Sequence, residues 1–365
     1  MPSSVFEGLV VDAPNRPPQV RTLHGPGELH RHEVRLRTAV AGICHTDIHY
    51  WEGRLPSGFP AVLGHEASAT VIEVGSAVSS VRIGDRVVVC LSVYCGECRA
   101  CISGRTHLCM NKAATRRRPE ASPRLTERGR AVHQLLDVGA FAQEMVVHHT
   151  AVTPIPDELS MEQAALLGCS VTTGFGAVFR TAQVQPGQAV VVIGCGSVGV
   201  CCVQASSLVG ANPIIAVDPS PGRRDLARSL GATHAISTDE VLSFVLETTA
   251  GGADHVFEAV GTPATIELAF DILAPGGTAT VAGAVGATDR VSIPGFALLY
   301  EKRLQGCNMG SNHPQTDIPR YAQMILAGQV DVDSLITERI DLDDVARVLA
   351  GGQTGLSGRS LVVMH

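Results

Sequence analysis

The chain has 365 residues, more than the ~100–200 residues of a usual domain, so two domains are expected. Hydrophobic residues make up 45% and charged residues 17% of the chain, a balance that excludes disordered, collagenous and coiled-coil proteins. The 28 Lys and Arg residues against 35 Asp and Glu residues give a net charge of −7, so no nucleic-acid partner is expected.

The N-terminal stretch MPSSVFEGLVVDAPNRPP has neither a basic region nor an apolar core, so no secretory signal is expected and a cytoplasmic location is predicted. Eleven cysteines in a reducing compartment indicate metal binding rather than disulfides. The one long uncharged run, between Arg180 and Asp218, is broken by prolines and glycines. We interpret it as two buried strands flanking a helix, not as a membrane span, and expect no membrane partner.

The first part of the chain, from Val5 to about His149, has short apolar runs broken by Gly and Pro. This rhythm is typical of a compact, mainly antiparallel β domain. The expected strands include Glu33–Ala41, Ala67–Val74, Arg86–Cys90 and Ala142–Val147.

From about Val171, apolar strands alternate with helical stretches. This alternation requires a parallel sheet with helical crossovers, so a doubly wound domain is expected here. The predicted elements are strand Val190–Ile193, a helix from Val198, strand Ile214–Val217, helix Arg223–Leu230, strand Ala235–Ile236, a helix from Asp239, strand His255–Glu258, helix Ala264–Leu273 and strand Thr278–Ala282.

After about Cys307 the alternation ends, and a helix over Ile318–Leu326 precedes a closing strand at Leu361–Met364. This tail is assigned to the first domain. The predicted architecture is a β-rich domain over residues 1–170 and 307–365, with a doubly wound α/β domain over residues 171–306.

The least structured stretch is Lys112–Arg130, which carries seven Lys and Arg residues against Glu120 and Glu127. Two interpretations stay open. The stretch is either a solvated surface loop or an anion-attracting rim near the mouth of an active site.

A GxGxxG motif at residues 194–199 follows the strand Val190–Ile193 and opens a helix. Its glycines permit a tight turn, close approach of a pyrophosphate and close helix–strand packing, while the N–H groups at the helix start point at the phosphates. Asp218, 19 residues beyond the last glycine, ends the next strand, where a carboxylate accepts ribose hydroxyls and repels a 2′-phosphate. NAD is therefore favoured over NADP, although Arg223 and Arg224 could accept a 2′-phosphate. The residues expected to bind the dinucleotide are Gly194, Gly196, Ser197, Val198, Gly199, Asp218 and Arg223.

Four cysteines, Cys95, Cys98, Cys101 and Cys109, lie within 15 residues. Short loops of this kind wrap a tetrahedral Zn²⁺ at Zn–S distances of about 2.3 Å, and four thiolates leave no open position, so the site is predicted to be structural. An iron–sulfur cluster is the competing interpretation, but nothing else in the sequence indicates electron transfer.

Three further candidate ligands are dispersed: Cys44 in GICHTDIH, His65 in GHE and Cys169 in GCS. Each alone has an ordinary interpretation, since a single buried Cys is usually a small hydrophobic residue. Together they supply the Cys, His and Cys of a catalytic zinc whose fourth position is open to water or substrate.

With these residues in place, the sequence resembles the zinc-dependent medium-chain alcohol dehydrogenases over essentially its whole length. The resemblance is carried by GHE at 64–66, GDRV at 84–87, the cysteine loop, Gly168-Cys169 and the nucleotide loop. The long segment from Asn111 to Gln143 is similar to the animal-type and thiol-dependent formaldehyde dehydrogenase branches. The resemblance implies a chaperonin-10-like catalytic domain, a Rossmann domain and a homodimer.

The resemblance also implies that Cys44, His65 and Cys169 bind the catalytic zinc. Thr46 would hydrogen-bond the alcohol oxygen, and His49 would complete a proton relay through the nicotinamide ribose to solvent. These residue types suit the chemistry, because a hydroxyl both donates and accepts a hydrogen bond and an imidazole titrates near neutral pH.

Four neighbouring residues are given supporting roles by the same resemblance. Asp47 would hold His65 in its ligating tautomer, and Glu66 would lie behind the metal. Arg359 matches an arginine that contacts the pyrophosphate. His45 stands where several members of the family carry an arginine on the pyrophosphate, so cofactor affinity would differ.

Alignment with the family places Leu55, Leu91, Leu135 and Leu136 on the substrate channel, although each has an ordinary interpretation as a core leucine. Such a channel is aliphatic and roomy, which suits a medium-chain or aromatic primary alcohol. Enzymes acting on the glutathione adduct of formaldehyde carry an acid where Leu55 aligns, which disfavours that substrate.

The expected function is that of an NAD-dependent zinc alcohol dehydrogenase with two Zn²⁺ per subunit. It would oxidise a primary alcohol to the aldehyde, or run the reverse, by hydride transfer from a zinc-bound alkoxide. The alternative within this class is a formaldehyde dehydrogenase acting on a thiol adduct. The basic stretch at 112–130 is the only sequence feature that favours it. A zinc hydrolase would not need the nucleotide loop, and a catalytically silent nucleotide-binding relative would lack one of the three dispersed ligands.

Overall fold

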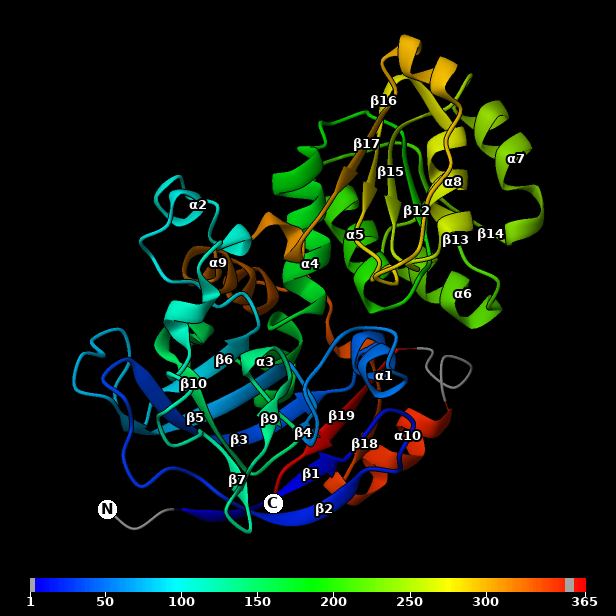
Figure 1. Cartoon of the computed structure of the whole chain (residues 1–365). Coiled ribbons are helices and arrows are strands. Elements are labelled where there is room, and N and C mark those ends of the chain that lie inside the picture. Colours follow the sequence, from blue (N-terminus) through cyan, green and yellow to red (C-terminus); the bar gives the residue numbers. More distant parts are fainter. Residues whose placement is uncertain (1–3, 352–357) are drawn as a thin grey trace. The chain divides into compact units, whose positions relative to one another are not determined.

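The computed structural model describes residues 4–351 and 358–365 (Figure 1). These residues divide into two compact units. The first contains the described residues up to Cys169, together with His313–Gly328 and those from Leu335 onward. The second contains Ser170–Asn312 and Gln329–Ser334.

The first unit is built on two mainly antiparallel sheets. One has six strands in the order β8 (Arg130–Ala131), β7 (Thr126–Glu127), β2 (Gln19–His24), β1 (Val5–Val11), β4 (Ala61–Val62) and β9 (His133–Gln134). The other has the order β11 (Val152–Pro154), β6 (Arg86–Cys90), β5 (Glu66–Val74), β3 (Glu33–Gly42), β19 (Arg359–Val363) and β18 (Ile336–Ile340), with β10 (Glu144–His148) also paired to β3.

Strand β3 is the centre of the second sheet and is buried along nearly its whole length. It pairs with β5 on one side and with both β10 and β19 on the other, so neither edge faces solvent. The C-terminal strand β19 pairs antiparallel with the end of β3, in the register Leu361 to Gly42. The tail of the chain is therefore fixed beside the residues that lead into Cys44.

Short helices complete the first unit: α1 (His45–Trp51), α2 (Arg99–Ile102), α3 (Met161–Leu167), α9 (Pro314–Leu326) and α10 (Val345–Gly351). The start of α3 is fixed by a capping box, in which Ser160 and Gln163 satisfy each other's backbone N–H groups. Helix α9 begins four residues before its predicted start, with Pro314 in its first turn, where no N–H is needed.

The second unit contains a six-stranded, all-parallel sheet in the order β14 (His234–Ile236), β13 (Ile214–Val217), β12 (Val190–Ile193), β15 (Ala253–Glu258), β16 (Leu273–Val281) and β17 (Arg303–Gly306). Counted along the chain from β12, this order is 3-2-1-4-5-6, that of a doubly wound dinucleotide-binding fold. The predicted parallel sheet is confirmed. Every residue of β12 and β13 is buried, as expected where helices cover both faces.

Five helices accompany this sheet: α4 (Ser170–Gly176), α5 (Ser197–Leu208), α6 (Pro221–Ser229), α7 (Val241–Thr248) and α8 (Pro263–Asp271). Helix α5 packs on β12 and β13, and α8 packs on β15 and β16 (Figure 1).

Several predicted boundaries in this unit differ from those of the structure, and two of the differences are described here. The helix expected from Asp239 starts with a 3₁₀ turn, Thr238–Glu240, and becomes α-helical only at Val241. The strand expected at Thr278 begins at Leu273, because it passes through Pro-Gly-Gly with a shift of register against β15 that Gly276 accommodates at a φ of +79°.

Candidate metal and nucleotide sites

Cys44, His65 and Cys169 come together in the first unit although the first and the last are 125 positions apart in the chain. Their ligand atoms all lie within 4.8 Å of one another and all three residues are buried. Cys44 is the N-cap of α1, directly after β3, while His65 precedes β5 and Cys169 follows α3. Two thiols and an imidazole form a donor set that zinc prefers, so the residues present fit the predicted metal.

Asp47 fixes two of these ligands at once. Its side chain is fully buried and accepts hydrogen bonds from the backbone N–H of Cys44 at 2.9 Å and of Gly64 at 3.0 Å. Oδ1 also lies 3.0 Å from Nδ1 of His65. A ring nitrogen held in this way leaves Nε2 as the ligand atom of His65.

Glu66 and Arg359 form a buried ion pair next to Cys44, with 3.2 Å between Nε and Oε1. Arg359 also donates to the carbonyl of Ile43 at 2.8 Å. Gly42 makes room for the carboxylate, since a Cβ there would lie 2.3 Å from Oε1 of Glu66. Arg359 is predicted to contact the pyrophosphate. Because its guanidinium is buried and bound to Glu66, it would have to bind both the carboxylate and the pyrophosphate.

The two thiols of this cluster differ in acidity. A hydrogen bond with Cys169 lowers the pKa of Cys44 well below its ordinary value, outweighing burial, and the charge of Arg359 acts in the same direction. The same contact raises the pKa of Cys169 well above its ordinary value. A metal ion that takes both sulfurs as thiolates would therefore release the proton of Cys169.

The four-cysteine loop also forms a compact cluster, with Sγ atoms within 4.8 Å of one another. Sγ of Cys101 lies 3.5 Å from that of Cys98 and 3.9 Å from that of Cys95. These distances bracket the separation of about 3.8 Å that follows from tetrahedral zinc with 2.3 Å bonds. Backbone hydrogen bonds from Cys101 and Met110 lower the pKa of Cys98 to about 6, which favours a thiolate. The donor set fits a structural zinc.

Helix α1 presents the residues predicted to handle the proton. Thr46 is half-buried, and His49, three residues later, lies on the same face of the helix. His49 is only 4% exposed, and burial followed by the charge of Arg54 lowers its pKa. The imidazole is therefore neutral near pH 7 and able to accept a proton. His45, the first residue of the helix, is half-buried.

The four predicted channel leucines separate into two groups. Leu135 is 2% exposed and belongs to the core of the first unit, which is its ordinary interpretation. Leu91 and Leu136 are half-buried and pack against that core, and Leu55 is half-buried beside α1. Leu55, Leu91 and Leu136 therefore keep surface that a substrate could touch.

In the second unit, the glycine-rich loop joins β12 to α5 at the point where the strand order reverses. Gly194 has a φ of +90°, and a Cβ on Gly199 would lie 1.8 Å from the carbonyl oxygen of Gly194. A Cβ on Gly196 would meet nothing within 4 Å. Gly194 and Gly199 are thus needed for packing. Gly196 leaves open space at the start of α5, which begins with Ser197 and Val198. This arrangement fits a bound pyrophosphate.

Asp218 ends β13 beside this loop. It is 2% exposed, and its carboxylate accepts hydrogen bonds from the N–H groups of Cys195 and Ser220, both at 2.9 Å. The guanidinium of Arg223 lies 3.7 Å away, and Arg224 donates to the backbone carbonyl of Asp218. Arg223 is thus near enough to Asp218 to weaken its repulsion of a 2′-phosphate.

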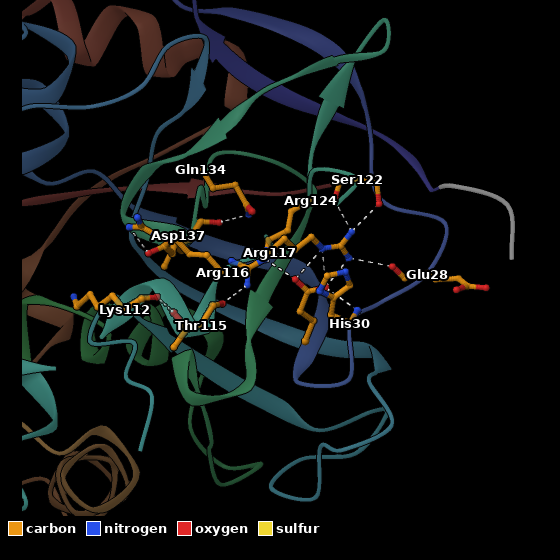
Figure 2. Close-up of polar contacts among 12 residues, drawn as sticks. Glu28, His30, Lys112, Thr115, Arg116, Arg117, Ser122, Arg124, Gln134 and Asp137 are labelled. Carbon is orange, nitrogen blue, oxygen red and sulfur yellow. Dashed lines mark hydrogen bonds and ion pairs between the residues drawn. The ribbon is translucent and has the colours of Figure 1, made fainter. Parts of the chain in front are cut away.

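Most of the basic stretch at 112–130 is exposed, as expected of a solvated surface loop, but some of its arginines bind acids of the chain (Figure 2). Arg117 and Arg124 are directed inward and share the carboxylate of Glu33, with side chains that are 5% and 9% exposed. Arg116 pairs with Asp137 through two hydrogen bonds. Three of the arginines therefore serve internal contacts and are not a free anion-attracting rim.

Two buried acids were not recognised in the sequence. Glu33, at the start of β3, receives the two arginines just described. Glu258 ends β15 and accepts hydrogen bonds from the N–H groups of Val260 and Gly261 and the hydroxyl of Thr265. The sequence feature that could have identified Glu258 as buried is its position as the one acid of the predicted strand His255–Glu258. Glu33 has no such feature, because a charged residue at the start of a strand is common.

No helix of the described residues is long and apolar enough to cross a membrane.

Sequence comparisons match two family profiles. The alcohol dehydrogenase GroES-like domain matches residues 30–157, and the zinc-binding dehydrogenase profile matches residues 197–327. Among curated proteins, an S-(hydroxymethyl)glutathione dehydrogenase of Synechocystis sp. is 33% identical over 339 residues, which cover 90% of this chain and 92% of that protein.

Solved structures give the same result. An alcohol dehydrogenase zinc-binding domain protein of Burkholderia ambifaria has a TM-score of 0.93 at 30% identity and covers all of both chains. Benzyl alcohol dehydrogenase of Acinetobacter calcoaceticus also has a TM-score of 0.93, at 26% identity, over 99% of this chain and 100% of that one. These matches confirm the predicted fold class.

Proposed function

Because the chain belongs to the zinc-dependent medium-chain alcohol dehydrogenase family, we propose that it oxidises a primary alcohol, medium-chain or aromatic, to the aldehyde, or catalyses the reverse reaction. The members of this family are oxidoreductases that act on small molecules with zinc and a nicotinamide cofactor. We therefore set aside the alternative of a zinc hydrolase. The observation that carries the proposal is the buried cluster of Cys44, His65 and Cys169 with Thr46 on the adjoining helix turn. In this proposal residues 1–170 and 307–365 are the catalytic domain and residues 171–306 bind the dinucleotide.

The residues of the chain divide the work between binding and proton transfer. Cys44, His65 and Cys169 would hold zinc, which as a Lewis acid lowers the pKa of an alcohol hydroxyl. Thr46 would orient the alcohol and accept its proton at Oγ1 while giving up its own hydroxyl proton. His49, neutral because of its burial, would take up the relayed proton at Nε2. The bound nicotinamide supplies the hydride acceptor.

We propose NAD rather than NADP as cofactor and two zinc ions per chain. NAD is supported by the carboxylate of Asp218 at the end of β13, and the second zinc by the tetrahedral spacing of the cysteine loop. Two thiol-rich zinc sites also support the cytoplasm as the working compartment, since thiols stay reduced there.

A second candidate is oxidation of a thiol adduct of formaldehyde, which the name of the Synechocystis relative favours. Such an adduct of glutathione carries carboxylates that need free cations. Three arginines of the basic stretch, Arg116, Arg117 and Arg124, are committed to Asp137 and Glu33. Leu55 is apolar where the glutathione-dependent enzymes carry an acid. We therefore favour an uncharged alcohol over the thiol adduct.

The test is a comparison of steady-state rates. Ethanol, hexanol and benzyl alcohol are assayed with NAD and with NADP, beside formaldehyde with and without glutathione. Higher kcat/KM for hexanol or benzyl alcohol than for the formaldehyde–glutathione mixture supports the proposal. Activity confined to that mixture selects the second candidate.

We also propose a homodimer formed through β17. This strand lies at one end of the parallel sheet, and on the described chain its outer edge has no paired strand. Phe296, Leu299 and Tyr300, just before it, are 70%, 75% and 54% exposed. A strand edge beside an apolar patch is a template for an identical strand of a second copy. Sedimentation of the parent as a dimer and of Leu299→Glu as a monomer would support this partner, and a monomeric parent would exclude it.

A further inference from the structure

Leu136 and Asp137 adopt a backbone conformation that side-chain-bearing residues rarely adopt. Their φ angles are +53° and +64°, both in the left-handed region, and neither residue is glycine. Two such residues in succession persist only where surrounding contacts hold them. The turn that contains them, η3 (Leu135–Asp137), is the segment that carries the predicted channel residue Leu136.

Arg116 supplies a two-point side-chain contact to this turn. Its guanidinium forms a fork on the carboxylate of Asp137, with 2.7 Å from Nε to Oδ1 and 2.9 Å from Nη2 to Oδ2 (Figure 2). Gln134 adds a bond from Nε2 to the carbonyl of Val138 at 2.8 Å, across the same turn. A two-point ion pair fixes orientation as well as distance.

The basic stretch at 112–130, from here on called the strap, carries Arg116 and is itself anchored. Arg117, the next residue, extends in the other direction, to Glu33, to the carbonyl of Glu28 and to Ser122 (Figure 2). Arg124 joins Glu33 to the carbonyl of Thr115, which closes the strap on itself. The position of Arg116 is therefore defined by β3, the strand that leads to Cys44.

The turn lies against the segment that leads to His65. The N–H of His133 donates to the carbonyl of Pro60 at 2.8 Å, and the N–H of Ala140 donates to the carbonyl of Gly64 at 2.9 Å. Both ends of the loop that carries Leu136 are thus hydrogen-bonded to residues 60–64, the five residues that precede this ligand. Leu136 is half-buried at the apex.

We propose that Arg116 and Asp137 are positioning residues that fix Leu136 as a wall of the alcohol site and thereby set which alcohols bind. The inference rests on the proposed function, because it assumes that an alcohol occupies the site beside His65 and that Leu136 lines its channel, as the family resemblance implies. Neither residue touches the reacting atoms. Loss of the fork lets the turn relax to an ordinary backbone conformation, which moves the Leu136 side chain without disturbing the zinc ligands.

The experiment compares Arg116→Met and Asp137→Asn with the parent over a series from ethanol to hexanol and benzyl alcohol. In both variants the KM for hexanol and benzyl alcohol should rise about 3–10-fold, the scale of one apolar contact in a binding pocket. The kcat for ethanol should stay within about 2-fold, because general base chemistry and metal binding are untouched. Arg118→Met, an exposed arginine of the same strap, is the matched control and should behave as the parent.

A double-mutant cycle separates positioning from general destabilisation. Leu136→Ala should raise the same KM values, and adding Arg116→Met to it should have little further effect, since the two act through one side chain. The inference would be overturned if the effects of Leu136→Ala and Arg116→Met on KM were additive. It would also be overturned if Arg116→Met and Asp137→Asn left the ratio of KM values between alcohols unchanged, or if they lowered kcat equally for every alcohol. If the parent protein oxidises none of these alcohols, the proposed function itself is refuted. This outcome is seen with the parent alone and so is distinct from a failure of the inference about Arg116 and Asp137.

Discussion

Replacement of Glu33 by Gln removes the charge that holds the strap at residues 112–130 to β3, the central strand of the second sheet. The side chain is 3% exposed and accepts from Arg117 at 2.6 Å and from Arg124 at 2.7 Å. Burial raises the pKa of this carboxyl, but the two arginines outweigh it and bring the pKa from 4.5 to about 2. At 1.36 kcal/mol per pKa unit, this shift corresponds to about 3 kcal/mol of stability at neutral pH. The variant also leaves two arginines poorly paired, so a loss of about 3–5 kcal/mol is expected.

The dependence on pH has a definite sign. A carboxyl whose pKa is lower in the folded than in the unfolded state stabilises the fold fully above the unfolded value, here 4.5, and loses this contribution as the pH falls through the folded value of about 2. The stability curves of parent and Glu33→Gln should therefore lie apart at pH 7 and converge between pH 4.5 and about pH 2.

The assay is urea unfolding followed by tryptophan fluorescence. The single tryptophan, Trp51, lies in the first unit, so its signal reports on the unit that contains Glu33. Glu120→Gln changes an exposed acid of the same strap and is the matched control. A variant as stable as the parent at pH 7, or a deficit that persists unchanged to about pH 2, would refute the ion-pair account.

Three further outcomes follow from the sites. Asp47→Asn should weaken the catalytic zinc site about 10–100-fold in a chelator competition, because it releases the ring of His65; an unchanged affinity would mean that the backbone alone orients the ligand. Asp218→Ala should narrow the preference for NAD over NADP in kcat/KM, and a parent that uses both equally would show that Arg223 dominates. His49→Gln should lower kcat at pH 7 by up to about 10²-fold, with a deficit that shrinks as the pH rises or buffer bases are added; a pH profile identical to that of the parent would remove His49 from the relay.

Elements and sites encoded by local pattern were predictable from the sequence. The strands Arg86–Cys90, Val190–Ile193 and Ile214–Val217 have the bounds that were predicted, because each contains a short run of β-branched apolar residues. The four-cysteine loop and the glycine-rich loop are contiguous, so their spacing alone indicates the geometry. In such segments the local preference and the tertiary structure agree.

Contacts between residues far apart in sequence were not predictable in this way. Glu33 and Arg117 are separated by 84 positions, and Glu66 and Arg359 by 293, so no periodicity marks them as partners. A run of arginines has the composition of a solvated loop until its acids are located in space. The left-handed turn at Leu136 likewise contains no glycine that would announce it, since tertiary contacts and not local preference hold it.

The most direct test of the central claim is the rate of NADH formation from NAD and a primary alcohol by the zinc-loaded protein, compared with that of Cys44→Ser. The account predicts steady oxidation of hexanol or benzyl alcohol by the parent and loss of that activity in the variant, which should keep its fold and the zinc of the four-cysteine loop. A zinc-loaded parent that reduces neither NAD nor NADP with any primary alcohol, or a Cys44→Ser variant as active as the parent, would contradict it.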